Sequence, residues 1–161
     1  MQFLSSDSEA SLALGRKLAA LLEPGMVVAL HGELGAGKTL FCRGIAQGLG
    51  YTGAVTSPTF TVAQEYPLQK GRYLYHLDLY RIQDEEAALA FGIDEFLFAD
   101  YALCLIEWPE RITALLQNQQ ALLTINLYHH SEEERRIELP DQLGERLIGL
   151  GLPANIEIVK D

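Results

Sequence analysis

The sequence predicts a single three-layer α/β domain over residues 1–161, with a mixed, mostly parallel sheet that antiparallel hairpins extend. Two continuous apolar runs, at residues 26–31 and 102–106, have the composition of strands buried on both faces, so we expect them to be parallel neighbours. Residues 60–80 and 121–139 each hold two strand-like segments around a turn, which indicates hairpins. The length of 161 residues suits one domain with a full-sized core.

The N-terminal segment has the pattern of an amphipathic helix over residues 5–22. Ser6 and Glu9 have the spacing of a capping box at its start. Leucines recur along it at helical spacing and form one apolar face. Pro24 and Gly25 then end the helix before the first buried strand.

A glycine-rich motif follows that strand. Residues 32–39 (GELGAGKT) fit G-x-x-x-x-G-K-[ST], the phosphate-binding loop known as Walker A. Phe41, Ile45 and Leu49 follow at helical spacing, so strand, loop and helix occur in the order that the motif requires. Glycines let backbone N–H groups approach phosphate oxygens, and the helix N-terminus adds a partial positive charge. The domain is therefore expected to be P-loop NTPase-like.

The motif also predicts a task for each polar side chain. The Lys38 ammonium is expected between the β- and γ-phosphates, and the Thr39 hydroxyl is expected to ligate Mg²⁺. The predicted nucleotide contacts in this segment are Glu33, Leu34, Gly35, Ala36, Gly37, Lys38, Thr39 and Leu40. ATP and Mg²⁺ are the expected ligands, and a GTPase is disfavoured because the guanine-reading N-K-x-D motif is absent.

Residues 50–59 are polar and broken by glycine and proline, so we expect a loop. Within it, residues 56–59 (TSPT) fit either a proline-bearing turn or a switch whose hydroxyl senses the γ-phosphate, with Thr59 as a nucleotide contact. The pattern alone slightly favours the turn. Strands are expected next, over residues 60–66 and 72–80.

Two acids follow strand-like segments. Asp78 shares one strand face with His76 and Tyr80, and such a face is either solvated or, beside a phosphate loop, able to hold the attacking water. Short helices are expected at residues 84–91 and 94–98. Glu107 then ends the second apolar run, which favours a Walker B acid that holds Mg²⁺ over an acid that merely caps the next helix.

The remaining segments carry less information. A helix is expected from Pro109 to about Gln117, followed by strands at residues 121–129 and 134–139. Residues 140–161 show no clear pattern. We find no internal repeat and no low-complexity linker.

Composition excludes several classes of function. The net charge is −10, with 12 Lys and Arg against 22 Asp and Glu, so direct, tight binding of nucleic acid is not expected. No apolar run approaches the ~20 residues that span a bilayer, and the N-terminus lacks the basic and apolar regions of a signal peptide. Cys42, Cys104 and the four histidines lack metal-ligand spacing, so buried free thiols and no zinc site are expected. A cytoplasmic protein with no membrane association follows.

Four motifs together resemble the TsaE (YjeE) ATPases of bacteria. They are residues 32–39, residues 56–60 (TSPTF), residues 76–81 (HLDLYR) and residues 106–111 (IEWPER). They occur in the order and at the spacing of the family. The last three are weak signals alone, and the combination of all four is specific.

The resemblance implies a cytoplasmic Mg²⁺-dependent ATPase that supports threonylcarbamoyl modification of the tRNA adenosine beside the anticodon. It implies the TsaB–TsaD complex as the partner, with ATP hydrolysis needed for repeated turnover and tRNA contacted only through that complex. Carried over, the catalytic residues are Lys38, Asp78 and Glu107, the metal ligands are Thr39 and Glu107, and Trp108 and residues 56–59 lie at the nucleotide.

Two alternatives remain from the residues themselves. A small-molecule kinase has the right size and loop, but no arginine cluster near a glycine-rich lid is present. A non-hydrolysing binding module, which uses ATP only to fix its shape, would release no phosphate. Arg81 and Arg111 are the candidates for an arginine that acts in the transition state, and the sequence does not indicate the oligomeric state.

Overall fold

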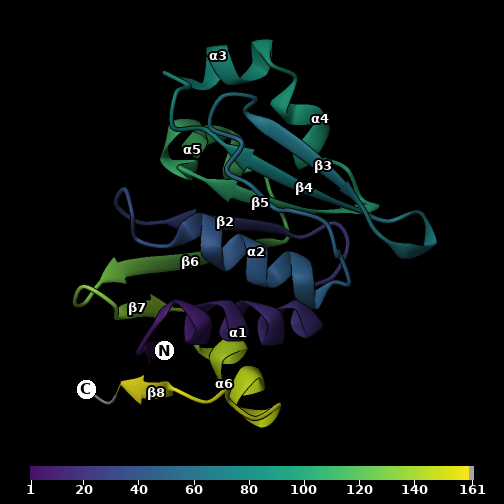
Figure 1. The fold of residues 1–161 in the computed structure, drawn as a ribbon. Helices are drawn as coiled ribbons and strands as arrows, with labels where there is room; N and C mark the ends of the chain where they lie inside the picture. The colour runs from purple at the N-terminus through teal and green to yellow at the C-terminus, as the bar shows by residue number, and fades with distance from the viewer. Residues whose placement is uncertain (160–161) are drawn as a thin grey trace.

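One eight-stranded sheet forms the centre of the molecule, in the order β3-β4-β5-β2-β6-β7-β1-β8 (Figure 1). The structure is a computed structural model and describes residues 1–159. The strands are β1 (Gln2–Ser5), β2 (Val27–His31), β3 (Ala63–Pro67), β4 (Tyr73–Asp78), β5 (Ala102–Glu107), β6 (Leu122–His129), β7 (Arg135–Glu138) and β8 (Ile156–Val159). Parallel pairs join β4, β5, β2 and β6, and antiparallel pairs flank them on both sides. The mixed sheet, the parallel pairing of the two apolar runs and both hairpins are thereby confirmed.

Helices cover both faces of the sheet and complete the three layers (Figure 1). They are α1 (Ser8–Leu18), η1 (Ala19–Leu21), α2 (Lys38–Gly48), η2 (Gln69–Gly71), α3 (Glu85–Ala90), α4 (Ile93–Leu97), η3 (Pro109–Ile112), α5 (Thr113–Leu116) and α6 (Asp141–Gly149). Side chains of α1, α2 and α6 share one apolar cluster with one sheet face. Those of α3, α4 and α5 share a second cluster with the other face. Within residues 1–159, every helix is too short or too polar to cross a bilayer.

The helix after the glycine loop, α2, lies unusually close to α1. A Cβ added at Gly44 would collide with the carbonyl oxygen of Leu12, and one at Gly48 would collide with that of Arg16. The missing side chains therefore let the two backbones touch. This packing holds α2, whose first residue is Lys38, in a fixed position against the sheet.

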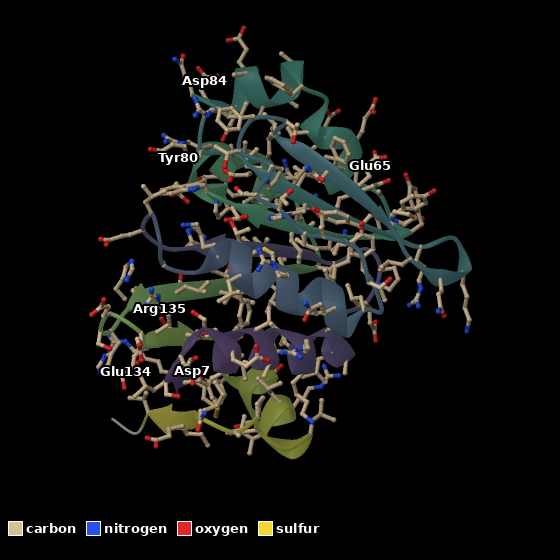
Figure 2. The ribbon with its side chains drawn as sticks, in the orientation of Figure 1. Asp7, Glu65, Tyr80, Asp84, Glu134 and Arg135 are labelled. Carbon is tan, nitrogen blue, oxygen red and sulfur yellow. The ribbon has the colours of Figure 1, made fainter. Side chains whose placement is uncertain are left out.

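The N-terminal segment differs from the expected capping box and helix over residues 5–22. Asp7, not Ser6, is the N-cap of α1 (Figure 2), and its carboxylate accepts a hydrogen bond from the Ala10 N–H at 2.7 Å. Residues 2–5 form β1, which lies between β7 and β8 in the sheet. Ser5, Ser6 and Asp7 are all residues that cap helices well, so local pattern alone did not choose among them.

The strand expected at residues 60–66 begins only at Ala63. Val62 has a φ of 66°, and its N–H donates to the Pro58 carbonyl oxygen at 2.7 Å. A left-handed backbone at a β-branched residue interrupts an extended run. The resulting turn is fixed on the end of β4, because the Asp78 N–H donates to the Val62 carbonyl oxygen at 2.9 Å.

The C-terminal segment, which has no clear pattern in the sequence, contains α6 and β8. In α6, Leu143 and Leu147 lie one turn apart and are buried against the α1 side of the sheet. β8 is an edge strand that pairs antiparallel with β1, with Ile158 opposite Phe3. Each element depends on a partner from the other end of the chain, and local patterning carries no information about such a partner.

Candidate nucleotide site

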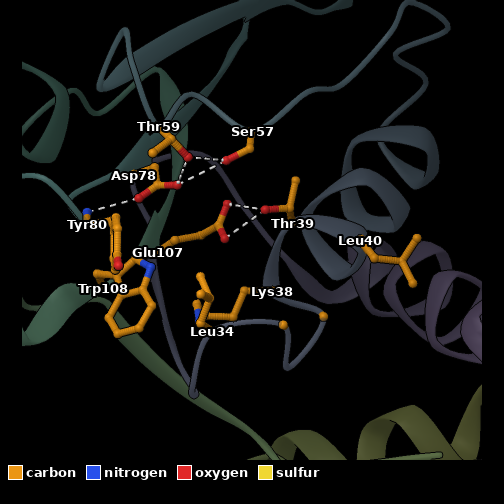
Figure 3. Close-up of a pocket in the computed structure, with 12 residues that line it drawn as sticks. Leu34, Lys38, Thr39, Leu40, Ser57, Thr59, Asp78, Tyr80, Glu107 and Trp108 are labelled. Atoms are coloured by element: carbon orange, nitrogen blue, oxygen red, sulfur yellow. Dashed lines mark hydrogen bonds between the residues drawn. The ribbon is translucent and has the colours of Figure 1, made fainter. Parts of the chain in front are cut away.

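A cavity of about 270 Å³ lies at the carboxyl ends of β2, β4 and β5 (Figure 3). Its lining residues are Leu34, Gly35, Gly37, Lys38, Thr39, Leu40, Ser57, Thr59, Asp78, Tyr80, Glu107 and Trp108. The parallel register explains this gathering, because Leu30 of β2 and Asp78 of β4 both pair with Glu107 of β5. All four sequence motifs therefore contribute to one cavity.

The glycine loop requires residues without a side chain at two points. Gly37 has a φ of 97° directly before α2, a conformation that favours glycine. Gly32 has a φ of 155°, and a Cβ there would lie 2.6 Å from the Leu127 carbonyl oxygen of β6. The loop consequently turns sharply enough for α2 to begin at the cavity wall, with the unpaired N–H groups of its first turn at that end.

Lys38 folds back onto this loop. Its Nζ donates to the carbonyl oxygens of Gly32 at 2.5 Å and Glu33 at 2.9 Å, and lies 4.1 Å from the centre of the Trp108 ring. The residue is only 5% exposed. Burial lowers the pKa of its ammonium group from the ordinary value, and the negative charge of Glu107 opposes that shift. The two hydrogen bonds to the loop hold the Nζ at the cavity.

Glu107 lies in direct contact with Thr39 and His76. Thr39 Oγ1 is 2.9 Å from Glu107 Oε1 and 3.0 Å from Oε2, and His76 Nε2 is 2.6 Å from Oε2. An ionised carboxylate only accepts hydrogen bonds, so the hydroxyl and the Nε2–H donate. Glu107 and His76 are buried. The structure therefore brings the two predicted metal ligands, Thr39 and Glu107, together and fixes the carboxylate from behind with His76.

The second acid, Asp78, holds the loop before β3. Its Oδ2 accepts from Ser57 Oγ at 3.1 Å and from Thr59 Oγ1 at 2.9 Å, and its Oδ1 accepts from the Tyr80 N–H at 2.9 Å (Figure 3). Asp78 is 3% exposed but lines the cavity. A change at Asp78 is therefore transmitted directly to residues 57–59.

Trp108 follows Glu107 in a backbone conformation that aromatic residues rarely adopt, with a φ of 61° and a ψ of 49°. Its ring lies against Lys38 and 5.1 Å from the Tyr80 ring. The left-handed residue ends β5 and leaves the indole at the cavity wall. The sole tryptophan of the chain is consequently a natural probe of this site.

Two predicted nucleotide contacts do not line the cavity. Ala36 is buried, and Glu33 lines a neighbouring cavity on the β6 side of the loop. The other predicted contacts and catalytic residues all line it, namely Leu34, Gly35, Gly37, Lys38, Thr39, Leu40, Thr59, Asp78, Glu107 and Trp108.

The two candidate arginines lie elsewhere. The Arg81 guanidinium stacks 4.5 Å above the exposed Phe60 ring, and Arg111 Nη2 is 3.5 Å from the Tyr80 carbonyl oxygen. Within residues 1–159, Lys38 is the one basic residue that lines the cavity.

His76 and Tyr80 extend the site beyond the predicted residues. The alternation of His76, Asp78 and Tyr80 along β4 was the available signal, and it also fitted a solvated strand face. His76 and Asp78 are 0% and 3% exposed, so that alternative is wrong for both. Which side of β4 is covered depends on α2 and on the loop before β3, and the strand pattern contains no information about either.

The donor set fits a magnesium–nucleotide ligand. Hydroxyl and carboxylate oxygens are the hard ligands that Mg²⁺ prefers, and Thr39 and Glu107 present both within 3.0 Å of each other. The glycine loop, the start of α2 and Lys38 supply donors and positive charge for phosphate oxygens.

Comparisons with known proteins agree with these features. A sequence model described as "Threonylcarbamoyl adenosine biosynthesis protein TsaE" matches residues 5–137, which include every residue that lines the cavity. The tRNA threonylcarbamoyladenosine biosynthesis protein TsaE of Haemophilus influenzae is 40% identical over 149 residues, which cover 88% of this chain and 91% of that protein. The protein of the same name from Bacillus subtilis is 40% identical over 138 residues, which cover 85% and 83%. The crystal structure of Bacillus subtilis YdiB has a TM-score of 0.72 and 33% identity, and the match covers 92% of this chain and 94% of that chain. The chain therefore belongs to the TsaE family.

Proposed function

We propose that this protein is a cytoplasmic Mg²⁺-dependent ATPase that supports threonylcarbamoyl modification of the tRNA adenosine beside the anticodon. It acts with the TsaB–TsaD complex, and its hydrolysis of ATP sustains repeated turnover. One observation carries the ATPase part: Lys38, Thr39, Glu107 and Asp78 meet in one cavity at the glycine loop. The names of the matched family and relatives support the tRNA part.

The binding roles follow from the contacts of each side chain. Lys38 exchanges its hydrogen bonds to the Gly32 and Glu33 carbonyl oxygens for bonds to the β- and γ-phosphates. Thr39 and Glu107 hold Mg²⁺, and the bound ion supplies positive charge that neutralises the phosphate oxygens. The hydrogen bond from His76 keeps the Glu107 carboxylate aimed at the cavity.

Asp78 is assigned to the attacking water. Its Oδ2 already accepts two hydroxyl hydrogen bonds, from Ser57 and Thr59, at the cavity wall. A water that replaces the exposed Ser57 hydroxyl can donate to the same oxygen, which orients its lone pair towards the γ-phosphate. Residues 56–59 thereby sense whether a γ-phosphate is present.

The test measures phosphate release and nucleotide binding by the full chain, alone and with TsaB–TsaD. We expect slow release by the chain alone, faster release with the partners, and quenching or enhancement of Trp108 fluorescence by Mg²⁺–ATP. Lys38→Ala should abolish the fluorescence change and the release, because the cavity loses its positive charge. Stoichiometric binding without phosphate release, even with the partners, would identify a binding module. Phosphoryl transfer to an added metabolite would identify a kinase.

A further inference from the structure

Three potential metal ligands gather behind the Mg²⁺ site. Cys42 of α2, His76 of β4 and Glu107 of β5 each offer one ligand atom, and these atoms all lie within 4.8 Å of one another. The three residues are 1%, 0% and 3% exposed. They lie far apart in the sequence, so no ligand spacing predicted their meeting.

The fold explains why these three side chains meet. His76 lies two residues before Asp78 on β4, and Asp78 pairs with Glu107, so His76 and Glu107 point from neighbouring strands to the same face. Cys42 lies one turn into α2, which covers that face. The second free cysteine, Cys104, belongs to the apolar cluster on the opposite face of the sheet.

The chemistry of the cluster differs from that of the Mg²⁺ ligands. A thiolate, an imidazole and a carboxylate are the ligands of Zn²⁺ and of similar thiophilic ions, whereas Mg²⁺ prefers oxygen ligands alone. His76 Nε2 lies 2.6 Å from Glu107 Oε2, so Nε2 is the nitrogen that faces the carboxylate. Within residues 1–159, the buried Nδ1 on the other side of the ring has no hydrogen-bond partner, so it can take up a proton that a metal displaces from Nε2.

We propose that Cys42, His76 and Glu107 form a binding site for a thiophilic divalent cation such as Zn²⁺, which competes with Mg²⁺ for Glu107. In the bound state the S–H bond of Cys42 is broken, its proton passes to solvent and a sulfur–metal bond forms. The Nε2 proton of His76 moves to Nδ1, so that Nε2 can bind the ion. One thiolate and one carboxylate then balance the two positive charges. The ion enters through the cavity, since Glu107 lines it.

Two properties of the free cluster agree with an occasional ion and not with a permanent one. Burial raises the pKa of the Cys42 thiol well above its ordinary value, so the thiol keeps its proton until an ion displaces it. Ligand atoms of a tetrahedral zinc site lie about 3.3–3.8 Å apart, given bonds of about 2.0–2.3 Å. His76 Nε2 and Glu107 Oε2, which lie 2.6 Å apart, must therefore move apart to admit the ion. That movement changes the contact between Glu107 and Thr39.

The direct test uses Co²⁺ as the probe, with the full chain in a buffer free of Mg²⁺ and nucleotide. We expect thiolate-to-cobalt charge-transfer absorption at one ion per chain, and one proton released per ion in an unbuffered titration. Cys42→Ser should abolish the absorption, and Cys104→Ser, the matched control on the other face, should retain it. Absorption that survives in Cys42→Ser, or cobalt binding without thiolate absorption or proton release, overturns the proposal. The proton titration needs no variant, so it decides the question even where Cys42→Ser does not fold.

A second arm tests the competition, which rests on the proposed function. We expect micromolar free Zn²⁺ to weaken Mg²⁺–nucleotide binding at least ~10-fold, as loss of a metal-orienting group does. Excess Mg²⁺ should restore binding, and Cys42→Ser should be insensitive to Zn²⁺. Cobalt absorption without competition overturns the shared use of Glu107. A chain that shows the absorption but never binds Mg²⁺–nucleotide overturns the proposed function and leaves the thiophilic site standing.

Discussion

At the scale of single residues, hydrogen-bond partners separate the two acids of the cavity. Glu107 is fixed by Thr39, the other predicted metal ligand, and by His76 behind it. Asp78 is fixed by hydroxyls of the loop before β3. Asp78 and Glu107 are register partners on neighbouring strands, yet their carboxylates have different partners and therefore serve different steps of the proposed reaction.

This division predicts different defects for two isosteric variants. Glu107→Gln should weaken Mg²⁺-dependent nucleotide binding about 10-fold or more, because an anionic metal ligand is lost. Asp78→Asn should leave binding nearly unchanged and slow hydrolysis about 10²–10⁴-fold, the usual contribution of a positioned base. Nucleotide affinity with and without Mg²⁺, measured beside single-turnover hydrolysis, separates the two. Similar defects in both variants, or the reverse pattern, contradict the assignment.

His76 is a positioning residue in this arrangement, and its two nitrogens allow a sharp test. Glutamine places an amide N–H about as far from the backbone as Nε2, whereas asparagine reaches only about as far as Nδ1. His76→Asn should weaken the response of nucleotide binding to Mg²⁺ by about 10–100-fold, and His76→Gln should restore most of it.

The measurement for His76 is the Mg²⁺ concentration that gives half-maximal change in Trp108 fluorescence, with thermal unfolding recorded for each variant. A merely structural role would lower the stability of both variants and leave that Mg²⁺ concentration unchanged.

At the scale of elements, the close contact between α1 and α2 at Gly44 fixes the position of the helix that follows the phosphate loop. Gly44→Ala should destabilise the fold by about 1–3 kcal/mol, because the new methyl group collides with the Leu12 backbone. For a chain of this size, each kcal/mol lowers Tm by about 2–4 °C. Gly149→Ala is the matched control, since no atom lies within 4 Å of the Cβ position at the end of α6. It should leave Tm unchanged or raise it slightly.

Thermal unfolding of the two glycine variants decides the point. Equal Tm values for both would mean that α1 and α2 can separate without cost. Nucleotide affinity of Gly44→Ala should also fall, since any shift of α2 moves Lys38 and Thr39 relative to Glu107.

The same elements explain how much the sequence alone could predict. The strand before Gly32, the loop, α2 and β5 were predicted correctly because local signals define them: apolar runs, a glycine motif and helical spacing. The elements β1, α6 and β8 were not predicted, since β1 and β8 pair with each other and α6 packs near them. In the site, residues with motif spacing were named, whereas the role of His76 depended on the packing of α2 over β4.

At the scale of the whole molecule, the negative charge of the chain disfavours direct contact with RNA. The net charge is −10, and Lys38 is the one basic residue that lines the described cavity. Phosphate contacts with RNA need exposed Lys and Arg in number, so the chain alone should bind tRNA very weakly. P-loop enzymes often take an arginine from a partner, worth ~10³–10⁵ in rate. The shortage of Lys and Arg for RNA contacts and the lack of an arginine in the cavity lining are consistent with a chain that works inside a larger assembly.

Residues 59 and 60 connect the candidate nucleotide cavity to the outer surface of the molecule. The Thr59 hydroxyl donates a hydrogen bond to Asp78 in the cavity, and the side chain of the next residue, Phe60, is 83% exposed. Among the exposed large apolar side chains of residues 1–159, Phe60 has the highest exposed fraction, so it is the first candidate for a contact with a partner. Under the proposed function, we expect loss of the γ-phosphate to change the hydrogen bonds at Asp78 and thereby to move Phe60.

We therefore predict that binding to TsaB–TsaD depends on the nucleotide and on Phe60. Complex formation should be tightest with ATP and weaker with ADP or no nucleotide, at fixed salt, and the ATPase rate should rise on binding. Phe60→Ala should weaken the complex about 10-fold or more, as removal of an aromatic contact residue commonly does, without changing the nucleotide affinity of the free chain. Leu150→Ala, a control at an exposed apolar residue after α6, should change neither.

Equal partner binding in all three nucleotide states would eliminate the switch, because a loop that does not respond to the γ-phosphate cannot change partner binding on hydrolysis. Fast hydrolysis by the isolated chain would remove the need for a partner arginine.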